Sequence, residues 1–279
     1  MMFRLFPTLM ILENLIFVKP YINNALVRNT ILKYSDPEAK HQHDLSDGDF
    51  PFVVSLVFIE QEIVTRHCTG SLLSPVWVLS ASNCFYDLLD RKFFVWYSNF
   101  TVSPLKSKMY ARVKKIYIHP LFQSTEFTRP GYFFGDNDIS LLRVRKLDTR
   151  YFGRLSPIDP AKMTGLPVTY IGAGAKVKPG DRRIIPLQVA EGVVITCGLS
   201  LTMWSQYMQC VAPKCSDKSH QPVHSDSGGP FIYDGKIVGV MSMGYQIPKS
   251  FILSNGLTPI SPYKSWITHI RQTRSNIIS

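Results

Sequence analysis

The hydrophobic positions from Pro51 onward gather in short runs rather than at helical intervals. Each run is rich in Val, Ile, Leu, Phe and Tyr, and Pro, Gly, Asp or Ser residues separate it from the next run. The runs read FVVSLVFI, TGSLLS, WVLSAS, FFVWYS, ARVKKIYIH, DISLLRV, VTYIGAG, PLQVAEGVVIT, GPFIYDGKIVGVMSM and SFILSNGLTPI. Short strands in regular succession, without helical patterns between them, predict an all-β sandwich or barrel.

The C-terminal segment follows a different pattern. Its apolar residues Tyr263, Trp266, Ile267 and Ile270 recur at three- to four-residue spacing after a Ser-Pro pair. This spacing predicts one amphipathic α-helix that packs against the β-structure.

The beginning of the chain has the layout of a secretory signal peptide. Arg4 stands before an apolar stretch from Leu5 to Val18, and the small residue Ala25 follows a polar exit. Glu13 interrupts the apolar stretch before it reaches the roughly 20 residues that a transmembrane helix requires. We therefore expect a signal peptide over residues 1–25, secretion to the extracellular space and no membrane span.

The rest of the chain divides into two parts. Residues 26–47 are polar and turn-rich, which favours a linker or pro-segment, whereas residues 48–275 hold the strand runs and the helical pattern. All-β domains of roughly 200–250 residues commonly fold as one unit. The second part is therefore predicted to be a single domain.

The chain is strongly basic, with a formal net charge of +11. Basic residues cluster within residues 106–115, 143–146 and 176–183. No signature of a nucleic-acid-binding module accompanies them, so we expect no nucleic-acid partner. An anionic glycan remains an alternative to an ordinary basic surface.

Motifs for cofactors and metals are weak. The segment GAGAKVKPG resembles a glycine-rich nucleotide loop, but no βαβ pattern follows it, and a β-turn fits better. His41 and His43 are only two ligands in a predicted linker, which is too few for a metal site. We expect neither a cofactor nor a bound metal.

The strongest local signal for chemistry is SDSGGP, from Ser225 to Pro230, directly before an apolar strand. A serine nucleophile needs its hydroxyl on a tight turn whose backbone N–H groups can stabilise a developing oxyanion. A serine followed by two glycines supplies such a turn. Ser227 is therefore the candidate nucleophile.

Two further segments connect this motif to a known family. HCTGSLLSPVWVLSASNC resembles the trypsin-family stretch in which a Gly-Ser strand leads to Trp, then to an Ala-rich strand end, then to His and Cys. DNDISLLRV resembles the family's aspartate motif, and weaker similarities extend from Gly48 to Ile270 in the family's order. This resemblance to trypsin-like (peptidase S1) serine proteases implies two six-stranded antiparallel β-barrels with a C-terminal α-helix.

The resemblance also implies catalytic positions. Ser227 falls on the catalytic serine, Asp138 on the catalytic aspartate and Asn83 on the catalytic histidine. An imidazole takes the serine proton and returns it to the leaving group, whereas an amide has no titratable nitrogen near neutral pH. We therefore expect a protease homologue with little or no proteolysis, which acts as a binding or regulatory protein for a protein or peptide.

Further site residues follow from the same resemblance. The oxyanion-hole N–H groups would belong to Ser225 and Ser227, and Ser225 replaces a glycine that tolerates positive φ values. The substrate pocket would include Gln221, Ser242 and Gly244. A neutral amide at position 221 would not select basic side chains as a carboxylate does.

The cysteine count favours an oxidising compartment. Five cysteines leave one thiol without a partner in the chain or paired with another chain. The resemblance implies the disulfides Cys68–Cys84 and Cys197–Cys210, which makes Cys215 the odd residue. In such a compartment the sequon that begins at Asn99 would be a glycosylation acceptor if it lies on the surface.

A different class of function stays open. The chain would be a weak or unusual serine endopeptidase if His67, His224 or the substrate itself supplied the missing base. Neither histidine occupies a position that the family uses for catalysis.

Overall fold

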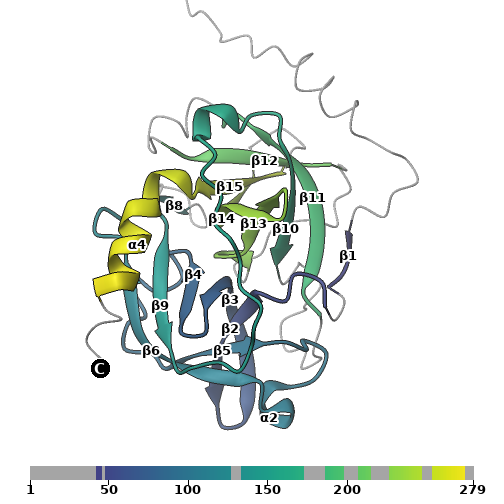
Figure 1. Cartoon of the computed structure of the whole chain (residues 1–279), viewed down its shortest axis with the longest axis vertical. Coiled ribbons are helices and arrows are strands. Elements are labelled where there is room, and N and C mark those ends of the chain that lie inside the picture. Colours follow the sequence, from purple (N-terminus) through teal and green to yellow (C-terminus); the bar gives the residue numbers. More distant parts are fainter. Residues whose placement is uncertain are drawn as a thin grey trace, which may run out of the picture.

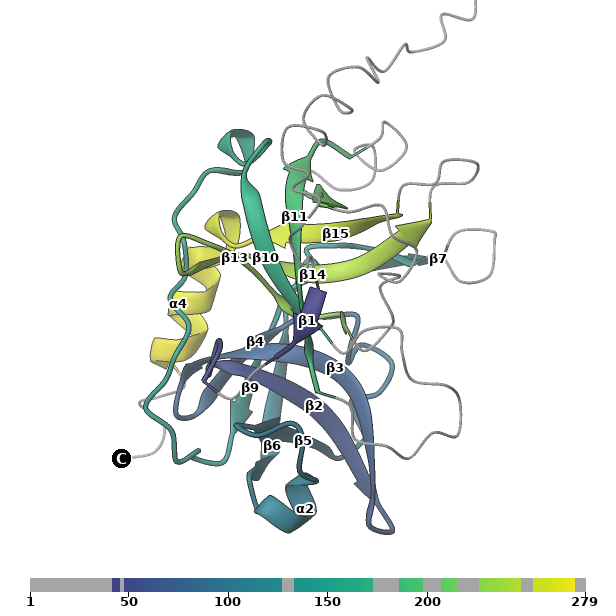
Figure 2. The same ribbon diagram turned by 90° about the vertical axis from the view of Figure 1, so that its right-hand side faces the viewer.

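The computed structural model describes residues 42–45, 48–126, 133–172, 186–197, 207–214, 226–246 and 253–273. Most of these residues form antiparallel strands, and the two groups of strands lie one above the other (Figures 1 and 2). No helix within these ranges is long and apolar enough to cross a membrane.

The first group of strands is a closed six-stranded barrel. Its strands follow the order β2-β3-β4-β9-β6-β5, and each pairs antiparallel with its neighbours. The bounds are β2 Val53–Glu60, β3 Ile63–Ser74, β4 Trp77–Ser80, β5 Phe93–Tyr97, β6 Tyr110–Ile118 and β9 Ser140–Val144.

The second group of strands is also closed. Its strands follow the order β11-β10-β13-β14-β15-β12, and the pairing of β12 with β11 completes the ring. The bounds are β10 Pro167–Gly172, β11 Gln188–Ile195, β12 Gln209–Pro213, β13 Pro230–Tyr233, β14 Lys236–Gln246 and β15 Leu253–Pro259. The predicted fold of two six-stranded antiparallel barrels is confirmed.

The C-terminal helix joins the two barrels. The 3₁₀ turn Ser261–Tyr263 leads into α4, Lys264–Thr273. Tyr263 and Ile267 of this segment are 4% and 1% exposed, and they share one hydrophobic cluster with Leu72 of β3 and Val240 of β14. The predicted amphipathic helix is therefore confirmed, and its apolar side packs against residues of both barrels.

Short elements complete the chain. β7 and β8, Gln123–Glu126 and Phe133–Asp136, pair with each other, α2 covers Pro104–Ser107 and a 3₁₀ turn covers Pro160–Lys162. The long run GPFIYDGKIVGVMSM forms two strands, because Asp234 and Gly235 both adopt positive φ, 49° and 63°, and make a tight hairpin turn between β13 and β14.

One segment differs from the sequence expectation. Residues Gln42–Asp44, which fall in the predicted linker, form β1 and pair with β11. Their side chains are polar, but an edge strand is held by backbone hydrogen bonds, which a polar sequence can supply as well as an apolar one. Composition therefore gave no signal for this strand.

Two disulfides connect loops to strands. Cys68 of β3 bonds to Cys84 just after β4, and Cys197 after β11 bonds to Cys210 of β12. The first bond lies in the buried core and holds the loop that carries Asn83 against β3. Cys215 lies outside the described residues.

Candidate functional site

Asp138 is a fully buried carboxylate two residues before the start of β9. Its Oδ1 accepts a hydrogen bond from the Asn83 backbone N–H at 2.8 Å. Its Oδ2 accepts from Asn83 Nδ2 at 2.6 Å and from Ser242 Oγ at 2.5 Å. These donors come from the first barrel and from β14 of the second barrel, so Asp138 links the two barrels.

Neighbouring serines hold this carboxylate in place. Ser82 Oγ donates to the Ile139 carbonyl at 2.6 Å, and Ser140 Oγ donates to the Ala81 carbonyl at 2.9 Å. The turn after β4 and the start of β9 are thus tied on both sides of the Asn83–Asp138 pair. The paired small polar residues in SASNC and DNDIS produce this arrangement.

The 3₁₀ turn before helix α4 supports the site. Asn137 adopts a left-handed conformation with φ 53°, which asparagine tolerates better than most residues. The Tyr263 hydroxyl donates to Asn137 Oδ1 at 3.2 Å. The residue before Asp138 is therefore held by the segment that starts the terminal helix.

Asn83 uses both hydrogens of its side-chain amide. One goes to Asp138 Oδ2, and the other goes to the Ser242 carbonyl at 2.6 Å. Because both partners can only accept at these atoms, the nitrogen rather than the oxygen of the amide must face them. The buried Oδ1 atom has no hydrogen-bond partner within the described part of the chain.

Ser227 donates its hydroxyl hydrogen to the same carbonyl. Ser227 Oγ lies 2.8 Å from Ser242 O, and Ser227 as a whole is 3% exposed. The Ser242 carbonyl thus accepts from both Ser227 and Asn83, while the Ser242 hydroxyl donates to Asp138. Ser242 is the centre of the network, a role that sequence reasoning missed when it assigned this residue only to the pocket.

The turn that carries Ser227 is fixed to strands of both barrels. The Thr69 N–H donates to the Ser227 carbonyl at 2.9 Å, and the Gly228 N–H donates to the Met241 carbonyl at 2.7 Å. Gly228 has φ 84°, and a Cβ atom there would lie 3.1 Å from the Ala81 nitrogen and closer still to Thr69 O. Glycine is therefore required by both conformation and space.

Burial dominates the electrostatics of Asp138. It raises the pKa of this carboxyl to about 6, although the hydrogen bonds from Ser242 and Asn83 favour the ionised form and lower the pKa. The carboxyl is thus ionised at neutral pH and takes up a proton at mildly acidic pH.

The other predicted site residues are placed as follows. Gly244 lies in β14 opposite Asn255 of β15. Gln221, Ser225 and His224 lie outside the described residues. The structure therefore brings together Asn83, Asp138, Ser227 and Ser242 out of the predicted set.

His67 is held by other groups. Its Nε2 lies 2.7 Å from the Cys84 carbonyl, and its ring packs beside those of Phe58 and Phe93, with centroid distances of 4.9 and 5.5 Å. A ring nitrogen that bonds to a carbonyl carries the proton, so this nitrogen is a donor rather than a base.

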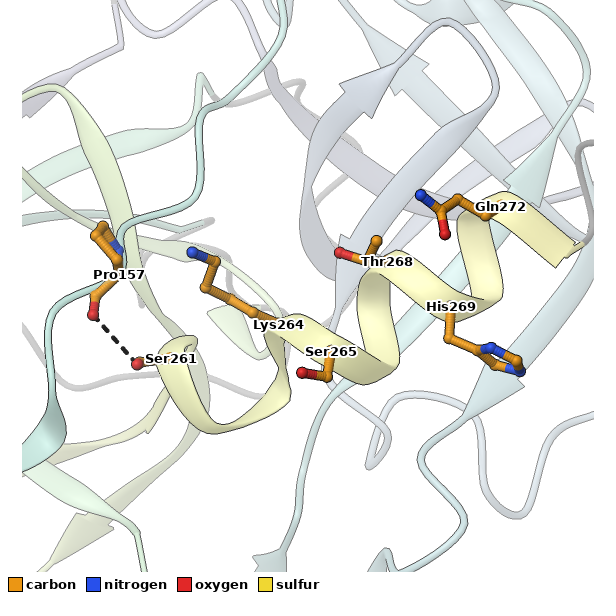
Figure 3. A pocket seen from close by; sticks show the side chains of 7 residues that line it. All are labelled: Pro157, Ser261, Lys264, Ser265, Thr268, His269 and Gln272. Carbon is orange, nitrogen blue, oxygen red and sulfur yellow. Dashed lines mark hydrogen bonds between the residues drawn. The ribbon is translucent and has the colours of Figure 1, made fainter.

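Two other features lie apart from this network. Within the described ranges, no three His, Cys, Asp or Glu residues gather as metal ligands would. An open polar groove of about 580 Å³ runs along α4 beside Lys264, His269 and Gln272, where Ser261 Oγ donates to the Pro157 carbonyl at 3.2 Å (Figure 3). None of the four network residues lines it.

The fold and the sequence together define the class of protein. The family model described as trypsin matches residues 40–267. The chain therefore belongs to the trypsin family of serine proteases and their homologues.

Individual relatives agree with this class. The chain is similar to trypsin of Phaedon cochleariae, 27% identical over 245 residues, which cover 81% of this chain and 85% of the relative. It is 29% identical to kallikrein 1-related peptidase b16 of Mus musculus, over 78% of this chain and 83% of the relative. The solved structure of HL collagenase superposes with a TM-score of 0.62 at 19% identity, over 82% of this chain and 97% of that structure, and shares the fold.

The raised pKa predicts a pH-dependent contribution to stability. Between the ordinary aspartate pKa near 3.9 and about 6, the folded protein binds a proton that the unfolded chain has released. This contribution is complete below about pH 4 and is lost as the pH rises through about 6. Relative to Asp138→Asn, the wild-type free energy of unfolding should therefore fall by up to roughly 3 kcal/mol from pH 4 to pH 7.

Urea denaturation of both proteins over this pH range measures the difference. Other titrating groups contribute equally to the two proteins and cancel. If the free energy of unfolding of wild type minus that of Asp138→Asn stayed constant or grew with pH, the raised pKa of Asp138 would be contradicted.

Proposed function

We propose that this chain is a secreted trypsin-family homologue that binds a protein or peptide partner and hydrolyses peptide bonds poorly or not at all. Asn83 stands at the motif position of the family's catalytic histidine, directly before Cys84. Its hydrogen bond to Asp138 takes the place of the one that an imidazole N–H would make.

The main support for this proposal is that no base is placed to accept the Ser227 proton within the described part of the chain. Acyl transfer needs a base that removes the Ser227 proton, holds it and returns it to the leaving amine. In the structure that proton points to the Ser242 carbonyl, which is not basic, and Asn83 has committed both amide hydrogens. The remaining amide oxygen of Asn83 can accept a hydrogen bond but cannot hold a proton near neutral pH.

The alternative of a weak endopeptidase requires another base. His67 donates to a carbonyl and packs against two aromatic rings, so the described geometry gives it no role at Ser227. His224 and the substrate remain as sources of a base. The labelling experiment below separates this alternative from the binding role.

A fluorophosphonate probe tests the proton path. Wild-type protein should label no faster than Ser227→Ala, whereas Asn83→His should label at least about a hundredfold faster, because an imidazole supplies the base whose loss costs subtilisin roughly a millionfold in turnover. Asn83→Gln, which enlarges the side chain but keeps an amide in place of a base, is the matched control and should stay unlabelled. Wild-type labelling that disappears in Ser227→Ala would favour the endopeptidase instead.

Secretion is supported by two observations. Both disulfides are of the kind that persist in oxidising compartments. At the sequon, Asn99 Oδ1 accepts hydrogen bonds from the Thr101 N–H at 2.7 Å and the Thr101 hydroxyl at 2.6 Å, in an exposed turn after β5. Thr101 is exposed and Asn99 is half-buried, so the sequon lies at the surface.

Glycosylation of Asn99 is therefore expected when the chain passes through a eukaryotic secretory pathway. Treatment of the secreted protein with peptide N-glycosidase should lower its mass by one glycan, and Thr101→Ala should abolish the change. Secreted protein of unmodified mass at Asn99 would contradict this expectation.

A further inference from the structure

A groove on the outer side of the first barrel gathers positive charge. It has a volume of about 390 Å³ and is formed by the segment before β5 and by β6. Its charged lining residues are Asp90, Arg91, Lys92, Arg112, Lys114 and Lys115. Five cations and one carboxylate give this lining an excess of four positive charges.

A break in strand pairing concentrates these cations. The register of β6 against β9 shifts between Val113 and Lys115, which makes Lys114 an extra residue. A bulge of this kind interrupts the alternation of side chains, so consecutive residues can face the same side. Arg112, Lys114 and Lys115 are all exposed.

The basic surface continues onto the neighbouring strand. Lys115 pairs in register with Arg143 of β9, and the Arg145 N–H donates to the Arg112 carbonyl at 3.0 Å. Arg145 and Lys146 are exposed at the end of that strand. Exposed cations thus follow β9 as well as β6, the strand that lines the groove.

Most of this charge is not neutralised by the protein. Arg91 pairs with Glu60 at 2.7 Å. Within the described part of the chain, no carboxylate lies within 4.0 Å of the charged ends of Lys92, Arg112, Lys114 or Lys115. Adjacent like charges repel one another, and a polyanion in the groove would relieve that repulsion.

We infer that this groove binds a sulfated glycan chain. Successive residues of a strand lie about 3.3 Å apart, so the cations of β6 present a row of charges to a linear polymer rather than a pocket for one small ion. Sulfate groups stay ionised at every physiological pH. This inference rests on the proposed secretion, which the two disulfides favour and which would bring the protein together with such glycans.

The groove fits a nucleic acid less well. Proteins that hold single strands stack the bases on exposed aromatic rings. The aromatic residue of this groove, Phe93, is 1% exposed and packs against Phe58 and Phe85 in the core. The site therefore offers charge without a stacking surface.

Two triple variants with equal loss of charge test the inference. The groove variant is Arg112→Gln, Lys114→Gln and Lys115→Gln. The control variant is Arg154→Gln, Lys162→Gln and Lys264→Gln, which removes one arginine and two lysines that are also exposed but lie outside the groove. Binding of the full chain to immobilised heparin is measured at about 0.15 M salt, where charges farther apart than about 8 Å are screened.

The groove variant should bind heparin at least about tenfold more weakly than wild type, and the control variant less than about threefold more weakly. On a plain sulfonate cation exchanger both variants should elute earlier by the same amount, because that matrix reports net charge. Equal losses on heparin, or no loss in the groove variant, would overturn the inference. A charge-matched single-stranded oligonucleotide that displaced heparin at equal concentration would show that the partner is a nucleic acid instead.

Discussion

The buried carboxylate of Asp138 is the constraint on which the rest of the site depends. Removal of this group from water is costly, and its pKa of about 6 shows that its hydrogen bonds do not fully offset the burial. The donors come from Asn83 beside β4 and from Ser242 in β14. The carboxylate therefore receives hydrogen bonds from both barrels, and the barrels must dock correctly for these bonds to form.

This network separates two roles that a histidine would combine. As a hydrogen-bond donor to the carboxylate, an asparagine amide can replace an imidazole, and its second hydrogen bonds to the Ser242 carbonyl. An asparagine amide cannot, however, accept and return a proton as an imidazole does. A chain with this substitution can keep the Ser227 turn, its glycine and the buried aspartate for structural reasons, because the network that orders them does not depend on catalysis.

Much of the architecture was predictable from the sequence. Alternating and continuous apolar runs marked β2, β4, β5, β6, β9 and β10, because burial in a barrel imposes hydrophobic side chains on strands. The three- to four-residue spacing of apolar residues predicted the terminal helix. By contrast β1 has a polar sequence, and β7 and β8 have short polar or aromatic sequences, so none of the three carries a periodic apolar signal.

The site was predictable only in part. Asn83, Asp138 and Ser227 were found through motif order, and the structure brings them together. The central role of the Ser242 carbonyl was not predicted, because every residue has a backbone carbonyl and a sequence motif cannot indicate which one accepts these hydrogen bonds. The basic groove depends on the bulge at Lys114, where the sequence shows only a cluster of charge and the pairing register decides which side chains share a face.

The most direct test of the central claim is peptide turnover by the purified, disulfide-bonded protein. Rates of cleavage of a diverse peptide mixture are compared between wild type and Ser227→Ala, each at enzyme concentrations high enough to detect a single turnover. With no base to accept the serine proton, the two proteins should be indistinguishable from buffer. Cleavage by wild type at ordinary enzymic rates that is absent from Ser227→Ala would contradict the account.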